Sequence, residues 1–96
     1  MQAAGLSVPR VVFTSNLQRH VNCPEAQVAP GTVASALAQV FAVQPQARGY
    51  VLDEQGHLRK HVVVFVDGQR VRDRKRLTDP VGEASEIYVL QALTGG

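Results

Sequence analysis

Four apolar residues repeat at helical spacing in the first half of the chain. They fall at i, i+4, i+7 and i+8, which predicts one apolar stripe on a helix of about three turns: Val33, Leu37, Val40 and Phe41. Thr32 is the expected N-cap, because its side-chain oxygen can accept a hydrogen bond from the first turn. Pro45 is expected either to end this helix or to begin a short extra turn through residues 47–49.

Two strands are predicted before the helix. Residues 10–14 are rich in β-branched and aromatic side chains and begin directly after Pro9, where a missing N–H does least harm. A second, weaker strand falls within residues 18–28, and its best-supported part is 26–28. Residues 1–9 are expected to form a flexible leader.

After the helix, the pattern predicts a short strand at residues 50–52, a turn at 53–56 and a returning segment at 57–59. Val62–Val66 is continuously apolar and β-branched, which is typical of a central strand covered on both faces or nearly so. Phe65 is accordingly expected in the core.

A hairpin and an irregular segment follow that strand. Asp67-Gly68 is a strong two-residue hairpin signal, so residues 69–72 are expected to pair back on the preceding strand. Residues 73–82 are polar and irregular, with Leu77 and Val81 expected to pack against the core.

The last strand is expected at residues 86–92. The order is then strand, strand, helix, strand, strand, strand, which indicates an α+β domain. We expect a mixed sheet of four to five strands with one main helix packed on one face. This order suggests the β-grasp, or ubiquitin-like, fold, in which the first and last strands lie in parallel at the centre of the sheet. The domain would span residues 10–93, followed by a flexible tail at 94–96.

Composition narrows the possible classes of protein. The chain has 96 residues, enough for one domain, and a formal net charge of +2, which does not by itself imply nucleic acid. Cys23 is the single cysteine, so no disulfide can form within the chain and a reducing cytoplasm is the expected location. The longest apolar run, Val62–Val66, is far too short to span a bilayer, and no signal peptide is expected at the N-terminus.

The sequence ends in Gly95-Gly96. Glycine makes up about 7% of average composition, so two glycines at chosen positions occur by chance in roughly 0.5% of cases. A frayed end is the plain alternative. Glycine lacks Cβ and reaches backbone conformations closed to other residues, so a diglycine tail can thread a narrow catalytic channel.

The chain resembles the MoaD/ThiS family of β-grasp sulfur carriers, small ubiquitin-like proteins that end in Gly-Gly. The resemblance covers residues 10–96, and its most specific parts are Val62–Val66 with Asp67-Gly68, and residues 90–96. Residues 56–61 look closer to the branch that includes CysO. The chain departs from the family at Ala84-Ser85, where many members have Gly-Asp, and at Gln91, where many have proline.

The resemblance implies that the protein is a carrier and not an enzyme, with no catalytic residue and no bound cofactor. Gly96 would be adenylated with ATP by a partner of the ubiquitin-activating type and converted to a thiocarboxylate, while Gly95 supplies clearance. A synthase would accept the sulfur, in the biosynthesis of cysteine, molybdopterin, thiamine or a related compound. One alternative is a ubiquitin-like modifier joined to lysines through Gly96, and another is a binding module with an inert tail. The free carrier is expected to be a monomer.

Four residues before the diglycine are candidate contacts with the partner. Leu93 and Thr94 flank the tail directly. Tyr88 and Leu90 could add to an apolar surface beside it, or could belong to the core, since one face of the strand must be buried.

Seven of the ten basic residues lie between Arg59 and Arg76. Arg70 and Arg72 are two apart on a predicted strand and so project from one face, where they could steer an acidic partner enzyme. Contact with RNA phosphates and a merely solvated face are the alternatives. No aromatic stacking platform is evident, so nucleic acid is not an expected partner.

No metal site is expected. His57 and His61 are four apart on an extended segment, which separates them by roughly 13 Å, too far to share an ion. His20 and Cys23 supply only two ligands, where a structural zinc needs four. A buried or half-buried thiol is the expected state of Cys23.

Overall fold

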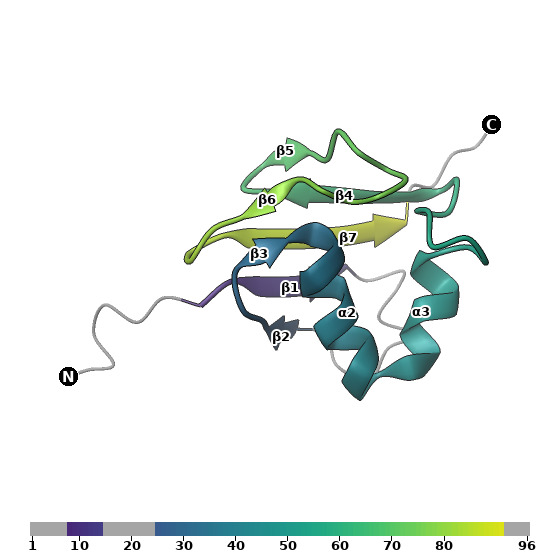
Figure 1. The fold of residues 1–96 in the computed structure, drawn as a ribbon, viewed down its shortest axis with the longest axis horizontal. Helices are drawn as coiled ribbons and strands as arrows, with labels where there is room; N and C mark the ends of the chain where they lie inside the picture. The colour runs from purple at the N-terminus through teal and green to yellow at the C-terminus, as the bar shows by residue number, and fades with distance from the viewer. Residues whose placement is uncertain (1–7, 15–24, 92–96) are drawn as a thin grey trace.

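The computed structural model describes residues 8–14 and 25–91. Predictions for the leader, for His20 and Cys23 and for residues 92–96 therefore lie outside the described residues. The main sheet has the strand order β2-β1-β7-β4-β5 (Figure 1). Its strands are β1 (Arg10–Phe13), β2 (Glu25–Gln27), β4 (Val62–Val66), β5 (Gln69–Arg70) and β7 (Glu86–Gln91).

The last strand lies at the centre of this sheet. β7 pairs in parallel with β1, with Val11 opposite Ile87, and pairs antiparallel with β4, with Val64 opposite Val89. The prediction that the first and last strands are parallel neighbours is confirmed. β7 pairs with β1 from Glu86 to Val89 and with β4 from Ile87 to Gln91, so its backbone is held in the sheet along its length.

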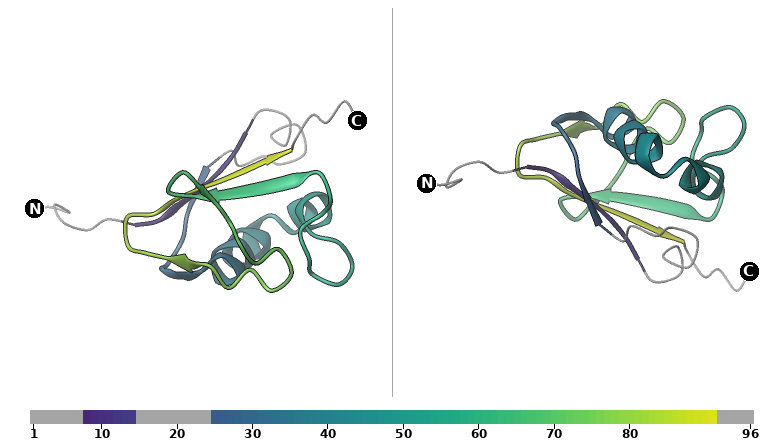
Figure 2. Two further views of the ribbon diagram at one scale, coloured as in Figure 1. Left: turned by 90° about the horizontal axis from the view of Figure 1, so that it is seen from above. Right: turned by 90° about the horizontal axis from the view of Figure 1, so that it is seen from below.

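Two helices pack on one face of the sheet, as Figure 2 shows. They are α2 (Val33–Val43) and α3 (Pro45–Val51). Thr32 is the N-cap of α2, as predicted: its hydroxyl accepts a hydrogen bond from Ser35 N, and the Ser35 hydroxyl accepts one from Thr32 N. The backbone carbonyls of Asp79 and Leu77 accept hydrogen bonds from Val33 N and Ala34 N, so the loop before β7 also satisfies the start of α2.

The core lies between the helices and the sheet. Alternate residues of the central strands face it, because side chains of a strand point to opposite faces in turn. Its members include Val11 and Phe13 of β1, Ile87 and Val89 of β7, and Val33, Leu37 and Val40 of α2. Leu77 and Val81 are also buried, which confirms the prediction that they pack against the core.

The prediction of a strand at residues 50–52 is wrong, because α3 continues through Val51. Pro45 at the first position favours a helical start, and Ala47 and Val51, four residues apart, are both fully buried on the inner side of α3. Only the last residue of the predicted strand has a strand-like contact: Leu52 forms a single bridge with Leu58. Burial of one helical face therefore prevails over the β propensity of residues 50–52.

Val62–Val66 was expected to be covered on both faces or nearly so, and the structure buries one face fully and the other only in part. Val62 and Val64 are buried, whereas Val63, Phe65 and Val66 are only partly buried. β4 lies beside the central strand rather than at the centre of the sheet. Its side chains alternate between the helix-covered face and the opposite face, which leaves Phe65 out of the core.

The hairpin after β4 forms as predicted. Val66 pairs with Gln69 across Asp67 and Gly68, whose φ angles of 51° and 83° are both positive, as a two-residue hairpin turn requires. The segment predicted to be irregular contains one short strand, β6 (Pro80–Val81), which pairs with β3 (Gly31–Thr32) just before α2.

Candidate functional site

The face of the sheet opposite α2 carries a group of partly buried apolar side chains from three adjacent strands. We call this group the far-face patch: Val12, Val63, Phe65, Tyr88 and Leu90. The group exists because β1, β4 and β7 each place alternate residues on this side of the sheet.

Strand register brings these side chains together. Tyr88 lies between Val12 of β1 and Phe65 of β4, and Leu90 lies beside Val63. Directly opposed side chains in neighbouring strands approach within about 5 Å, close enough to form a continuous surface. Tyr88 and Leu90 are both only partly buried, whereas Ile87 and Val89 between them are fully buried. The structure thus places both candidate residues on the face away from the core.

Arg10 holds the strands together beside this patch. Its guanidinium donates hydrogen bonds to Glu25 of β2 and Glu86 of β7 and forms ion pairs with both. These bonds, first with Glu86 and then with Glu25, raise the pKa of Arg10. The three side chains remain substantially exposed, so they fix geometry more than they add stability.

The two arginines predicted for electrostatic docking lie at the edge of the sheet. Arg70 ends β5, and its guanidinium carbon lies 6.0 Å from the centroid of the Phe65 ring, at the limit of a cation–π contact. Arg72 lies beyond the end of the strand, and both arginines are exposed. They line one shallow hollow of about 300 Å³, so the fold does bring them together.

The remaining predicted site residues belong to the C-terminal tail. Leu93, Thr94, Gly95 and Gly96 lie outside the described residues. The last described residue, Gln91, still pairs with Val62 of β4. The final strand is therefore paired up to the residue at which the description ends.

The carboxylates with altered pKa values accept hydrogen bonds from backbone N–H groups in the loops. Asp73 accepts hydrogen bonds from the backbone N–H of Arg76 and Lys75 and from the Thr78 hydroxyl, and these lower its pKa to about 2. Asp79 accepts bonds from the backbone N–H of Arg72 and Asp73, which lower its pKa as well.

Asp53 is the third such carboxylate. Its pKa is lowered mainly by the hydrogen bond from the backbone N–H of His57. Carboxylates stabilised in their charged form suit turn structure rather than proton transfer near neutral pH.

The histidine and acidic side chains of residues 8–14 and 25–91 are dispersed over the fold. No group of three or more His, Cys, Asp or Glu side chains in these ranges could hold a metal ion. His57 is partly buried and His61 is exposed. In the same ranges, no helix is both long and apolar enough to cross a membrane.

Sequence reasoning did not assign Val12, Val63 and Phe65 to the site. Every residue of β4 is apolar, so the sequence alone does not show which of its side chains face the core and which face the opposite side of the sheet. The signal that could have found them is the register: once β1, β7 and β4 are adjacent, residues opposite Tyr88 and Leu90 must share their face.

Solved structures share this fold. SAMP1 of Haloferax volcanii, a small archaeal modifier protein, is 19% identical, with a TM-score of 0.77 over 92% of this chain and 98% of that chain. A chain of the Amycolatopsis orientalis BexX/CysO complex is 20% identical, with a TM-score of 0.77 over 92% of this chain and 99% of that chain. CysO of Mycobacterium tuberculosis is 17% identical, with a TM-score of 0.75 over 88% of this chain and 99% of that chain. These likenesses define a ubiquitin-like β-grasp protein, as the order of elements predicted.

The family follows from the sequence comparison. The ThiS family model matches residues 18–96, which is most of the chain and includes Gly95-Gly96. The chain belongs to the ThiS family, the sulfur-carrier branch of the β-grasp fold. A comparison with curated protein sequences gave no match.

Proposed function

We propose that this protein carries sulfur as a thiocarboxylate on Gly96. The observation that carries the proposal is the ThiS family match, which continues through the terminal diglycine. The structure supports it by holding the last strand, β7, between β1 and β4 up to Val89 and against β4 up to Gln91. A carrier whose final strand is held in the sheet presents the same surface to each enzyme that processes the tail.

The proposed chemistry begins with activation of the Gly96 carboxylate. A carboxylate is a poor acyl donor, because attack on it must expel oxide from a resonance-stabilised anion. A partner enzyme of the ubiquitin-activating type would let a carboxylate oxygen attack the α-phosphorus of ATP, forming an acyl adenylate and releasing pyrophosphate. Sulfide would then attack the carbonyl and expel AMP, which leaves a C-terminal thiocarboxylate. ATP is consumed by the partner, so the carrier needs no bound cofactor and no catalytic residue of its own.

The two glycines have separate roles in this proposal. A side chain on Gly96 would crowd the carbonyl under attack, and one on Gly95 would widen the tail in the narrow part of the channel. Leu93 and Thr94 would contact the channel entrance. The carrier would work in the cytoplasm as a free monomer and pass its sulfur to a synthase in the biosynthesis of cysteine, molybdopterin, thiamine or a related compound.

We further propose that the far-face patch docks the activating enzyme. It combines apolar contact area with Tyr88, a residue type enriched at protein interfaces, and Leu90 lies in the strand that leads to the tail. Arg70 and Arg72 at the sheet edge would add attraction to an acidic surface of that enzyme.

A second candidate function is protein modification. The likeness to small archaeal modifier protein 1 favours it, because the fold and the activation step would be shared. In that case Gly96 would end in an isopeptide bond to a lysine of another protein.

Intact-mass analysis after incubation with an activating enzyme, ATP and sulfide separates the two functions. The carrier predicts a mass increase equal to the exchange of one oxygen for one sulfur atom. The modifier predicts higher-mass conjugates in cell extract and no sulfur. An unchanged mass in the purified reaction and in cell extract would contradict both proposed functions. The tail would then be inert.

A further inference from the structure

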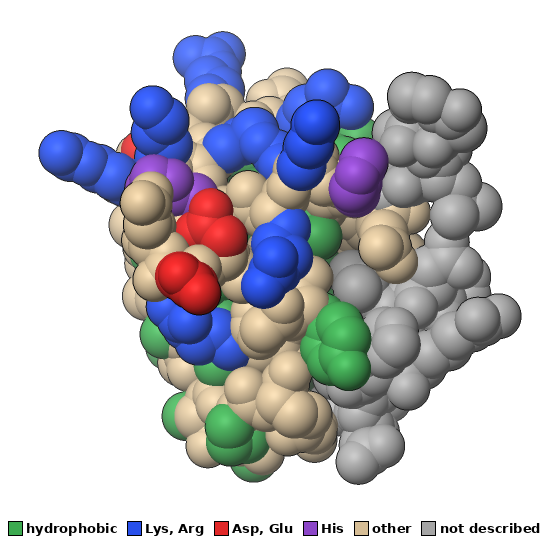
Figure 3. All heavy atoms as spheres, turned by 90° about the vertical axis from the view of Figure 1, so that its right-hand side faces the viewer, with side chains coloured by type: hydrophobic (Ala, Val, Ile, Leu, Met, Phe, Trp, Pro, Cys, Tyr) green, Lys and Arg blue, Asp and Glu red, His purple; other side chains and the backbone are tan. Residues whose placement is uncertain are grey.

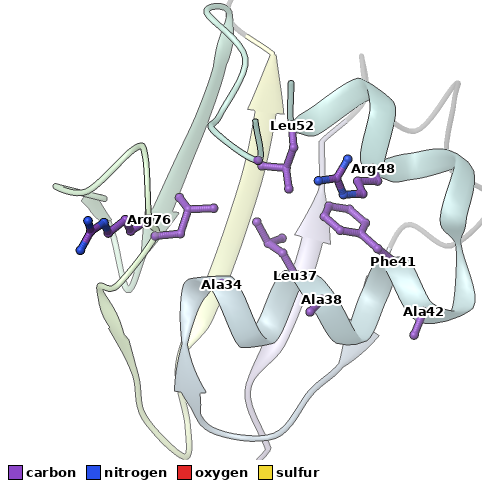
Figure 4. Close-up of a pocket in the computed structure, with 10 residues that line it drawn as sticks. Ala34, Leu37, Ala38, Phe41, Ala42, Arg48, Leu52 and Arg76 are labelled. Carbon is purple, nitrogen blue, oxygen red and sulfur yellow. The ribbon is translucent and has the colours of Figure 1, made fainter. Parts of the chain in front are cut away.

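A separate apolar groove lies on the helical side of the molecule. It has a volume of about 360 Å³ and runs between α2, α3 and the loops that contain Leu52 and Leu77 (Figure 4). Its lining includes Ala34, Ala38 and Ala42, which are exposed, and Leu37 and Phe41 beneath them. The small alanine side chains leave the groove uncovered along α2 from Ala34 to Ala42, a rise of about 12 Å at 1.5 Å per residue.

One charged side chain enters this groove. Arg48 extends from α3 towards the cavity and lies beside the Phe41 ring (Figure 4). Its Nη2 lies against Gly56 on the opposite loop, 3.9 Å from the position that a Cβ would take there. Arg48 forms no ion pair within the described part of the chain. An unpaired guanidinium at an apolar cavity favours an occupant that brings a carboxylate.

The surroundings of the groove are basic. Arg74 Nη2 donates a hydrogen bond of 2.8 Å to Arg59 O, and Arg59 Nε donates one of 2.6 Å to Gly49 O on α3, so these side chains are held beside the helix. Arg76 also lines the groove. Figure 3 views the molecule from the end where α3 lies and shows Lys and Arg side chains gathered there, with Asp or Glu side chains among them.

Arg59 interacts electrostatically with Asp53, whose pKa it helps to lower, whereas Arg48, Arg74 and Arg76 form no ion pair in residues 8–14 and 25–91. The ion pairs found there involve only Arg10. The nearby carboxylates of Asp53 and Asp73 instead accept hydrogen bonds from the backbone N–H groups of their own loops. The positive charge around the groove is therefore left to attract an external anion.

We infer that the groove docks an acidic amphipathic helix of a partner protein. Apolar side chains of that helix would fill the space over Leu37 and Phe41, and flanking carboxylates would pair with Arg48 and Arg76. Helix-in-groove recognition of this kind relies on apolar anchors along about two turns, which matches the length of the groove. Charge complementarity selects the acidic partner over a basic one.

The position of the groove gives it a distinct use. It lies on the helical side of the sheet, whereas the far-face patch lies on the opposite side. A partner in the groove therefore leaves the far face free, so the carrier could be held by one protein while another processes its tail. Nucleic acid is disfavoured because the lining is apolar and calls for an apolar anchor.

The test uses a fluorescent helical peptide with leucines on one face and glutamates beside them, titrated with the full chain. Saturable binding is expected, with NMR shift changes centred on α2 and Arg48. Ala38→Glu, at an exposed helical position in the groove, is expected to weaken binding about tenfold or more by inserting a carboxylate. Val43→Glu is the matched control, because it makes the same charge change on the same helix at an exposed residue outside the groove lining.

A second pair of variants tests the proposal even if the first pair fails to fold. Arg48→Ala is expected to weaken binding, and Lys60→Ala, at an exposed basic residue outside the groove, is expected to leave it unchanged. The proposal is overturned by absent binding, by equal binding of a lysine analogue of the peptide, or by equal loss in Val43→Glu. It is also overturned if single-stranded RNA or decanoate binds the groove while the peptide does not. None of these readouts requires activation of Gly96, so the result is independent of the proposed sulfur-carrier function.

Discussion

The Ser85 hydroxyl donates a hydrogen bond of 2.9 Å to Asp67 Oδ2, which joins the start of β7 to the turn of the β4–β5 hairpin. Asp67 Oδ1 accepts a second bond, from Glu86 N, and Ser85 Oγ accepts one from Gly82 N. Ser85 is 6% exposed. Asp67 and Ser85 together fix the entry into the last strand.

We predict that Ser85→Ala lowers the free energy of unfolding by about 0.5–1.5 kcal/mol, because it removes the buried hydroxyl that hydrogen-bonds to the exposed residues Asp67 and Gly82. Urea denaturation measures the change. Glu83→Ala, at an exposed neighbouring position, is the control and should have little effect. Equal stability of Ser85→Ala and the wild type would show that this hydrogen-bonded link is unimportant.

Asp73 makes the stability of the fold sensitive to acid. Its pKa is about 2 in the folded protein and about 3.9 in an unfolded chain, so its charged form favours folding. This contribution is fully present above the unfolded pKa and is lost as the pH falls through 3.9 towards about 2. Asp53 and Asp79, whose pKa values are also lowered, act in the same direction.

We therefore predict that Asp73→Asn is less stable than the wild type at neutral pH and that the difference shrinks as the pH approaches about 2. Urea midpoints measured across this range provide the comparison. Glu83→Gln, at an exposed residue, is the control. A difference that stays constant across the range would contradict the role given to the Asp73 carboxylate.

The far-face patch predicts a loss of docking without a loss of fold. Leu90→Glu places a charge in this partly buried surface and should raise the KM for the carrier in ATP–pyrophosphate exchange about tenfold or more. Val43→Glu adds the same charge on the helical side and should leave the KM unchanged. Circular dichroism checks that both variants fold. An unchanged KM for Leu90→Glu would remove the patch from the interface.

Much of the fold could be predicted from local sequence signals. The helical stripe, the Thr32 cap and the Asp67-Gly68 turn each depend on residues close together in the chain, and each forms as expected. The helix at residues 45–51 could not be distinguished from a strand, because its type is decided by burial of Ala47 and Val51 against distant elements. Local propensity does not contain that information.

The site was predictable only in part, for a similar reason. Tyr88 and Leu90 lie on a strand that visibly alternates, but the face they occupy depends on which side α2 packs. Val12 and Phe65 join them only through pairing across β1, β7 and β4. The groove beside Arg48 arises where two helices and two loops meet, and no contiguous motif marks it.

The central claim, that Gly96 carries the sulfur, is tested most directly by fragment-ion mass spectrometry of the C-terminal peptide after activation with ATP and sulfide. We predict that the exchange of one oxygen for one sulfur atom maps to Gly96 in the wild type. The chain lacking Gly96 should fold equally well and take up no sulfur. Sulfur located at any other residue, or equal sulfur uptake by the chain without Gly96, would contradict the claim.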